Sequence, residues 1–220
     1  MKHVELHPWR VSAAEAVAIQ QRLRGQVLAE GEPATVRSVV GVDMGVRGDV
    51  MRAAAVALDY PGLSVVARSL AELPLEFPYI PGLLSFREAP AILAALGGLE
   101  LEPDLVFVDG QGVAHPRRFG IASHLGLLLD RPTIGVAKSI LVGHHEPVGP
   151  TVGDRAPLVA DGEVVGYALR TRPGVKPVYI SVGHRIALEA AGEWTLRCSR
   201  GYRLPEPTRR AHQLASGPSV

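Results

Sequence analysis

Two short apolar runs, Leu105–Val108 and Thr133–Ala137, constrain the fold of this chain most strongly. Apolar residues with helical spacing precede the first run at Ala91–Leu99 and separate the two runs at Ile121–Leu129. Strands that are buried on both faces of a parallel sheet show such continuous apolar runs between helices. We therefore predict an α/β fold in which the two runs are parallel strands.

The rest of the chain predicts further elements on either side of this unit. Before it lie a helical pattern and three short runs between turn residues, which predict a helix at Ala13–Leu28 and antiparallel strands at Val36–Val42, Met51–Leu58 and Leu63–Ala71. After it, we predict a proline-containing loop, a hairpin, a strand and a helix, at Glu146–Leu158, Glu163–Thr171, Val178–Val182 and Ile186–Ala191. Because no clear linker or repeat interrupts the 220 residues, we expect a single domain over residues 1–220.

Composition limits the classes of protein and partner. The 23 basic and 22 acidic residues nearly cancel, so the net charge does not suggest nucleic acid, and an anionic partner needs a local basic patch or a bound cation. Cys198 is the single cysteine and the N-terminus lacks the apolar stretch of a secretory signal, which favours a cytoplasmic protein. No apolar run reaches the roughly 18 residues that span a bilayer. We expect a monomer without membrane association.

Two aspartates occur where a carboxylate needs an explanation. Asp109 directly follows the run Leu105–Val108, and Asp43 follows Val39-Val40-Gly41-Val42 inside the first strand, where aspartate is disfavoured. An unpaired buried charge costs several kcal/mol or more, so each carboxylate needs a cation. Taken singly, a salt bridge or a plain Asp-Gly turn is the better interpretation of each residue. Together, strand-end acids at the carboxyl edge of an α/β sheet indicate a ligand site.

Glu88 has two interpretations. The stretch Ser85-Phe86-Arg87-Glu88 fits a capping box, in which the serine and the glutamate close a helix start. Pro90 argues against it, because a proline inside the helix clashes with a preceding carbonyl. If Glu88 is free of capping, it can join Asp43 and Asp109 around a hard divalent cation such as Mg²⁺.

Lys138 closes the strand predicted at Thr133–Ala137, and the chain has only two other lysines, Lys2 and Lys176. An ammonium at the carboxyl edge of a buried strand, beside the strand that ends at Asp109, can hold a phosphate or an attacking water. A lysine that simply reaches solvent explains the pattern equally well.

Four long motifs of this chain closely resemble the endonuclease V family, the deoxyinosine 3′ endonucleases. They read FPYIPGLLSFREAP, PDLVFVDGQGVAHPRRFGIASHLG, RPTIGVAKSIL and GYRLPEPTRRAHQLA. The resemblance covers nearly the whole chain and implies a ribonuclease H-like α/β fold, a five-stranded mixed sheet flanked by helices. One departure is Met44-Gly45-Val46, where relatives usually have a small hydroxyl residue and an aromatic after the aspartate.

The resemblance also implies the chemistry. It assigns metal binding to Asp43, Glu88 and Asp109, places His212 in a helix as a fourth catalytic residue, and gives Lys138 the task of positioning water or phosphate. The expected cofactor is Mg²⁺, with Mn²⁺ as a substitute. The expected reaction is hydrolysis of the second phosphodiester bond 3′ to deoxyinosine in DNA, with water as the nucleophile and a 3′-hydroxyl and a 5′-phosphate as products.

The same resemblance assigns substrate recognition to two loops. Tyr79, Ile80 and Pro81 would be a wedge that opens the base stack, and main-chain groups at Gly82, Leu84, Gly110 and Ile121 would read the flipped base. His115, Arg117 and Arg118 would contact the nucleic acid backbone, and a second arginine-rich stretch contains Arg197, Arg200, Arg203, Arg209 and Arg210. Without the family, tight turns and solvated charges would explain both features. A ribonuclease for inosine-containing RNA and a non-catalytic binder of damaged nucleic acid are the alternatives.

Overall fold

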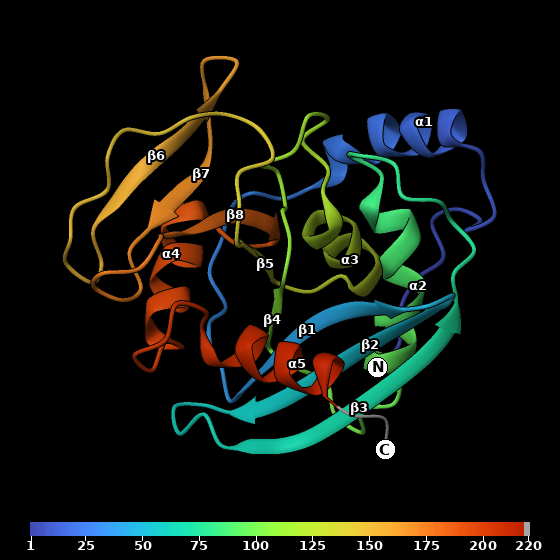
Figure 1. Cartoon of the computed structure of the whole chain (residues 1–220), viewed down its shortest axis with the longest axis horizontal. Coiled ribbons are helices and arrows are strands. Elements are labelled where there is room, and N and C mark those ends of the chain that lie inside the picture. Colours follow the sequence, from blue (N-terminus) through green and yellow to red (C-terminus); the bar gives the residue numbers. More distant parts are fainter. Residues whose placement is uncertain (218–220) are drawn as a thin grey trace.

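A mixed sheet forms the framework of the computed structural model, which describes residues 1–217 (Figure 1). Within these residues the sheet has eight strands in the order β3-β2-β1-β4-β5-β8-β7-β6. In chain order the strands are β1 Ser38–Arg47, β2 Val50–Asp59, β3 Val65–Pro74, β4 Leu105–Val108, β5 Thr133–Ala137, β6 Arg155–Ala160, β7 Glu163–Leu169 and β8 Val178–His184. The expected count of five strands is therefore wrong for this sheet.

The pairing of the strands agrees with the sequence pattern. β2 pairs antiparallel with both β1 and β3, whereas β4 pairs in parallel with both β1 and β5. The predicted parallel unit and the predicted antiparallel meander are thus both confirmed. Beyond β5 the sheet continues with the antiparallel strands β8, β7 and β6.

Strand β6 overlaps the segment that was expected to be a loop. Its residue Pro157 pairs opposite Tyr167 of β7, and β6 lies at the edge of the sheet. An edge strand tolerates a proline because one side of the strand has no neighbour that needs the missing N–H donor. The prolines in this segment therefore argue against an internal strand, but they are compatible with an edge strand such as β6.

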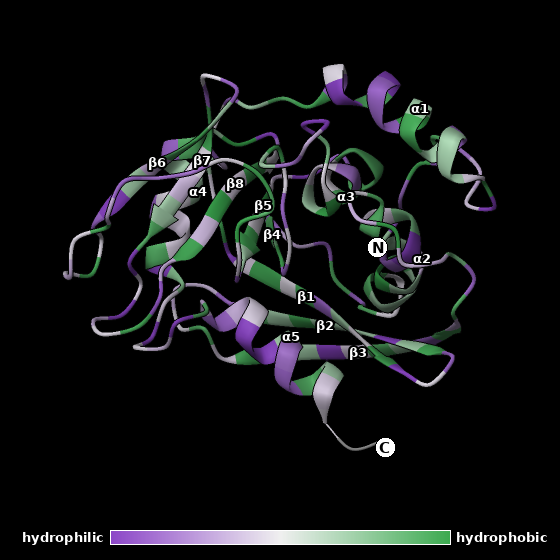
Figure 2. Cartoon of the chain, turned by 45° about the horizontal axis from the view of Figure 1, so that its top comes forward, coloured by the Kyte–Doolittle hydropathy of each residue, from purple (hydrophilic) through white to green (hydrophobic). Residues whose placement is uncertain are grey.

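Helices cover both faces of the sheet (Figure 1). They are α1 Ala13–Leu23, the 3-10 turn η1 Arg24–Gln26, α2 Leu84–Gly97, α3 Ile121–Leu129, α4 Leu188–Arg197 and α5 Glu206–Ser216. The first apolar core joins α2 and α3 to one face of β1, β2 and β4, while the second core joins α4 and α5 to the other. The ribbon of α5 is coloured mainly hydrophilic in Figure 2, and its buried Ala211 packs in the second core.

Helix α2 begins at Leu84 and continues through Pro90, so the prediction that a helix begins at Ala91 is wrong. Phe86 and Ala89, which lie before the proline, are buried in the helix. Burial of this first part of the helix outweighs the one hydrogen bond that Pro90 cannot donate. The helix also has no side-chain cap at Leu83, so Ser85 and Glu88 do not form a capping box.

Alternation along β1 sends its side chains to two different layers. Val40 and Val42 pack in the core with α2 and α3, whereas Val39 packs in the core with α4 and α5. Gly41 lies on the same side as Val39, and a Cβ at Gly41 would lie 1.9 Å from the carbonyl oxygen of Pro207. Only glycine permits this approach of α5 to β1, and Asp43 is the next residue on that side.

Candidate active site

Strand register brings Asp43 and Asp109 together. Val42 and Val108 are paired in the parallel ladder between β1 and β4, and each aspartate follows its valine directly. The backbone N–H of Asp109 donates to the carbonyl of Val42 at 3.2 Å. Two separate segments therefore place two carboxylates at one edge of the sheet, as the strand-end pattern indicates.

Helix α5 adds His212 to this pair. The Nδ1 atom of His212 lies 2.7 Å from Oδ2 of Asp43, and the imidazole is about half exposed. One possible ligand atom from each of Asp43, Asp109 and His212 lies within 4.8 Å of the other two. The close approach of α5 at Gly41 makes this meeting possible.

Lys138 completes the cluster from the end of β5. Its Nζ lies 2.5 Å from Oδ2 of Asp109, whose side chain is only 10% exposed. Burial and the neighbouring charge of Asp43 raise the pKa of Asp109, while the Lys138 ammonium acts in the opposite direction. The lysine is thus the one cation in direct contact with this carboxylate among the described residues.

Glu88 faces the same edge from α2. Its carboxylate lies outside the 4.8 Å group of Asp43, Asp109 and His212. Burial, followed by the charges of Asp43 and Asp109, raises the pKa of Glu88 to about 8. The charges of Asp43 and Asp109 are therefore close enough to Glu88 to disfavour its ionisation.

A cavity of about 220 Å³ has none of the acids in its lining, but it is lined by residues that lie close to Glu88, Asp109 and Lys138 in the chain. Seven residues predicted for nucleic acid contact or base reading line it: Tyr79, Ile80, Pro81, Gly82, Leu84, His115 and Ile121. Seven others were not predicted: Gln20, Ser85, Gln111, Gly120, Ser139, Ile140 and Leu141. Gly110 is outside the lining, but a Cβ there would lie 2.5 Å from Cγ2 of Ile121.

Chain continuity connects this cavity to the acid cluster. Gln111 lies two residues after Asp109, and Ser139 directly follows Lys138. The side-chain amide of Gln111 donates to the carbonyl of Ser139 at 3.1 Å, which joins the two loops at the cavity wall. A larger cavity of about 780 Å³, lined in part by Trp9, Phe77 and Arg87, is lined by none of the predicted site residues.

Two helices begin at the cavity wall. Leu84 is the first residue of α2 and Ile121 is the first residue of α3, and neither helix has a side-chain cap at its N-terminus within the described chain. The first N–H groups of a helix have no partner in a preceding helical turn, so helix ends can offer hydrogen-bond donors to a ligand. Two of these groups already have backbone partners, because Ala122 donates to the carbonyl of Gln111 at 3.0 Å and Phe86 donates to that of Leu83 at 3.1 Å.

Three side chains hold the loop that carries the predicted wedge. The carbonyl oxygen of Gly82 accepts from Nε2 of Gln20 at 3.0 Å, Nε2 of His115 at 3.0 Å and Nη2 of Arg117 at 2.7 Å. Nδ1 of His115 accepts from the backbone N–H of Arg117, and burial lowers the pKa of His115 to about 4. His115 is therefore a neutral side chain that fixes this loop.

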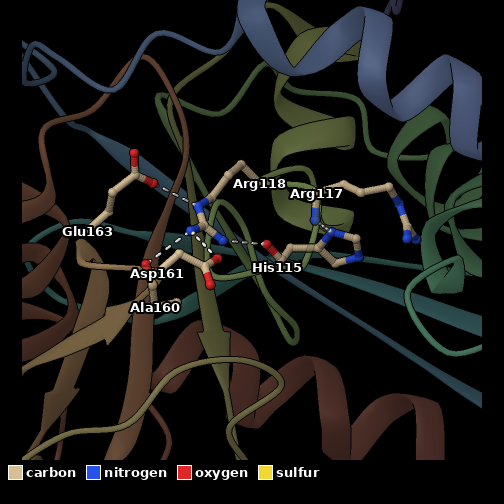
Figure 3. Close-up of polar contacts among 6 residues, drawn as sticks. All are labelled: His115, Arg117, Arg118, Ala160, Asp161 and Glu163. Carbon is tan, nitrogen blue, oxygen red and sulfur yellow. Dashed lines mark hydrogen bonds and ion pairs between the residues drawn. The ribbon is translucent and has the colours of Figure 1, made fainter.

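Arg118 is bound within the chain (Figure 3). Its Nη2 lies 3.1 Å from Oδ2 of Asp161, and its Nε lies 3.2 Å from Oε2 of Glu163. The guanidinium groups of Arg117 and Arg118 point in opposite directions from their loop in Figure 3. Arg118 thus anchors the turn between β6 and β7.

The second arginine-rich stretch also has partners within the chain. Arg209 and Arg210 both pair with the buried Glu206, and Arg203 donates to the carbonyl of Lys138 at 2.5 Å. Arg197 pairs with Glu32 and Glu193, and Arg200 donates to three backbone carbonyls. These contacts give each arginine a role in holding the protein together.

The fold and this edge define a class of protein: an α/β protein with a cluster of carboxylates of the kind that phosphodiester-hydrolysing enzymes use. The model of the family described as Endonuclease V matches residues 21–213. The chain belongs to the endonuclease V family, whose members are nucleases.

Relatives and solved structures agree on this assignment. The chain is 53% identical over 219 residues to an Endonuclease V of Trichormus variabilis, covering 98% of this chain and 99% of that protein. The crystal structure of an Endonuclease V from Streptomyces avermitilis superposes with a TM-score of 0.90 at 49% identity, covering 94% of this chain and 92% of the other. An Endonuclease V from Ciona intestinalis, in complex with a 23mer DNA containing an inosine followed by a ribo-adenosine, superposes with a TM-score of 0.84 at 29% identity, covering 93% and 97%.

No helix in residues 1–217 has the length and apolar character to cross a membrane.

Proposed function

We propose that this protein is a DNA repair endonuclease that hydrolyses the second phosphodiester bond 3′ to deoxyinosine. One observation carries the proposal: the cluster of Asp43, Asp109 and His212 is joined through two loops to a cavity lined by the residues predicted to read the base. The Ciona intestinalis relative bound to inosine-containing DNA supports the choice of lesion.

The acid cluster fits a divalent cation. Burial, followed by neighbouring negative charge, raises the pKa values of Glu88 and Asp109, and a bound cation would offset both effects. Carboxylate oxygens suit Mg²⁺ and Mn²⁺, so Asp43, Asp109 and Glu88 would hold the ion, with His212 as a ligand or as an orienting partner of Asp43. A bound ion supplies charge stabilisation at the scissile phosphate.

The residues of the chain would then divide the reaction between them. Water would attack phosphorus in line with the bond to the 3′ oxygen and lose a proton. The bond to the 3′ oxygen would break, that oxygen would take up a proton as the 3′-hydroxyl, and the phosphate would stay on the 5′ oxygen of the other fragment. Lys138, held 2.5 Å from Asp109, would orient the water or a phosphate oxygen. His212 would keep the Asp43 carboxylate in its orientation through the 2.7 Å contact.

Recognition would require the base to leave the stack. Tyr79 is 68% exposed, which suits a side chain that enters the duplex beside the cavity. Main-chain groups at Gly82, Leu84, Gly110 and Ile121 would read the flipped base, aided by the open helix N-termini at Leu84 and Ile121. Contact of His115, Arg117 and Arg118 with the nucleic acid backbone stays a prediction, and their partners favour a role in holding the loops.

The protein would act as a cytoplasmic monomer in a single domain over residues 1–220. Its strands β3, β2, β1, β4 and β5 would form the ribonuclease H-like unit, with β8, β7 and β6 as an extension of the same sheet. Inosine-containing RNA is the second candidate substrate, because the strand bound by the Ciona intestinalis relative has a ribonucleotide after the inosine. The acid cluster disfavours a binder without catalysis.

Cleavage of an end-labelled duplex with a single deoxyinosine tests the proposal, with and without Mg²⁺. We expect a cut at the second bond 3′ to inosine that requires the ion, and no cut in a matched duplex with adenosine. Matched DNA and RNA strands decide between the two substrates. Equal cleavage of inosine and adenosine strands would contradict the proposed specificity.

A further inference from the structure

A chain of hydrogen bonds leads from the N-terminal segment to the wall of the 220 Å³ cavity. His124 of α3 is completely buried, and its Nε2 lies 2.6 Å from Nε2 of His7. The Nδ1 atom of His124 lies 3.1 Å from the hydroxyl of Ser85, and Nδ1 of His7 lies 2.8 Å from the carbonyl oxygen of Pro8. The order of groups is therefore Pro8, His7, His124 and Ser85.

The carbonyl at one end determines the direction of every bond in this chain. A carbonyl oxygen only accepts, so Nδ1 of His7 carries the hydrogen and Nε2 of a neutral His7 has a lone pair. Nε2 of His124 must then donate to His7, which leaves Nδ1 of a neutral His124 as an acceptor. The hydroxyl hydrogen of Ser85 consequently points at His124.

Both imidazoles are held in the neutral form that this direction requires. Burial lowers the pKa of His124 to about 3, with a further contribution from His7, and burial also lowers the pKa of His7. The rings of Trp9, Phe86 and Phe119 lie within 5.4 Å of the His124 ring, centroid to centroid. An imidazolium in this aromatic setting would lack the hydration that stabilises its charge.

The chain ends among the residues assigned to base reading. Ser85 lines the cavity and is 2% exposed, and it follows Leu84, the first residue of α2. His124 lies one helical turn after Ile121, the first residue of α3. The bond between Ser85 and His124 thus joins the two helices whose N-termini meet at the cavity.

We propose that Ser85 is a specificity-determining residue whose hydroxyl is fixed by His124 and His7 as a hydrogen-bond acceptor for a purine that carries a hydrogen on ring N1. The inference rests on the proposed function and identifies the side chain that completes its base site. Hypoxanthine has an N1–H to donate and an O6 to accept from the helix N-termini. Adenine presents a lone pair at N1, which would face the lone pair of the hydroxyl.

Selectivity between two substrates tests the role of the hydroxyl. The two substrates are a duplex with inosine and the same duplex with nebularine, a purine nucleoside without hydrogen on N1. The ratio of kcat/KM for inosine to kcat/KM for nebularine measures selectivity, and we expect Ser85→Ala to lower this ratio about tenfold. Nebularine also lacks O6, but that difference is the same for parent and variant. Ser123→Ala is the control, because Ser123 is a buried serine of α3 that does not line the cavity.

His124→Phe tests the fixed direction of the hydroxyl. The variant keeps an aromatic ring in the pocket but removes the acceptor, so the hydroxyl of Ser85 is free to turn and the selectivity should also fall. Retention of the parental ratio in both Ser85→Ala and His124→Phe, with thermal melting showing folded proteins, would overturn the inference. If the parent itself fails to prefer inosine, the proposed function is wrong, and the two failures are distinguishable.

Discussion

The charged side chains at the sheet edge include both repulsive and attractive pairs. Asp43, Glu88 and Asp109 repel one another, while Lys138 is the cation that contacts Asp109. Such a cluster is costly for the folded protein when no cation is bound. A site of this kind is expected where binding and chemistry, rather than stability, determine which residues are present.

Glu88 makes the stability of the metal-free protein depend on pH. Its raised pKa means that the folded protein binds this proton more tightly than the unfolded chain does. The stabilising contribution is complete below about pH 4.5 and is lost as the pH rises to about 8.

We predict that urea unfolding in EDTA gives a free energy of unfolding that falls over this pH range in the parent more steeply than in Glu88→Gln. Glu76→Gln, which removes an exposed carboxylate paired with Arg10, is the control. Identical pH profiles for the parent and Glu88→Gln would show that Glu88 is not buried beside the aspartates.

Substitution of Gly82 tests the role of the loop that is held by Gln20, His115 and Arg117. Its φ is +78°, and a Cβ would lie 2.7 Å from Nη2 of Arg117. Gly48 also has a positive φ, of +58°, but no atom lies within 4 Å of its Cβ position. Both alanine variants should lose about 1–2 kcal/mol of stability from the backbone alone.

Only Gly82→Ala should also lower the rate of inosine cleavage, because only there does the methyl group displace a side chain, Arg117, that holds a loop lining the cavity. Single-turnover rates and urea midpoints for the two variants measure this difference. Equal effects of Gly82→Ala and Gly48→Ala on cleavage would place base recognition elsewhere.

At the scale of elements, local patterns predict the centre of the sheet well. The bounds of β4, β5 and α3 are as predicted, because buried parallel strands and the helix between them have distinct apolar runs. Local sequence does not predict strand β6 or the start of α2, since each element contains a proline that only its tertiary position allows. The adjacency of Asp43, which lies inside β1, and Asp109, which follows β4, comes from the parallel register of the two strands, and local sequence does not show that α5 approaches at Gly41.

Several residues of the cavity had no detectable sequence pattern. Gln20 is a buried polar residue in a helix that looks amphipathic, and its contact with Gly82 joins segments 62 residues apart. Ser85 looked like part of a capping box, whereas its hydroxyl bonds to His124. Long-range contacts of this kind depend on the packing of α1, α2 and α3 and are not encoded in a short motif.

The loop that begins at Tyr79 allows a test of the proposed wedge. Tyr79→Ala should weaken cleavage of an inosine duplex more than cleavage of the same single strand, because a single strand has no base pair to open. Rates on both substrates give the comparison, with Tyr202→Ala as a control, since Tyr202 is also an exposed tyrosine but lies outside the cavity. An identical loss on both substrates would favour simple stacking over wedging.

For the whole molecule, the site depends on segments that are far apart in the chain. Asp43 and His212 are separated by 169 positions, and they meet because β1 and α5 pack against each other. Similarity to the endonuclease V family extends over 98% of the chain, so the sheet extension beyond β5 belongs to the same unit of sequence as the acids. The candidate site is thus formed only when segments from both halves of the chain pack together.

The most direct measurement compares cleavage and binding of an inosine duplex by Asp109→Ala and the parent in Mg²⁺. We predict that cleavage is abolished while the affinity for inosine DNA is largely kept, because a cation at the acids would serve the chemical step more than docking. Asp104→Ala is the matched control: its carboxylate lies just before β4, at the opposite end of the strand from Asp109, and accepts from the N–H groups of Arg37 and Ser38. Asp104→Ala should cleave the inosine duplex under all conditions in which the variant is folded. Full turnover by Asp109→Ala would contradict the assignment of the acid cluster as the catalytic centre.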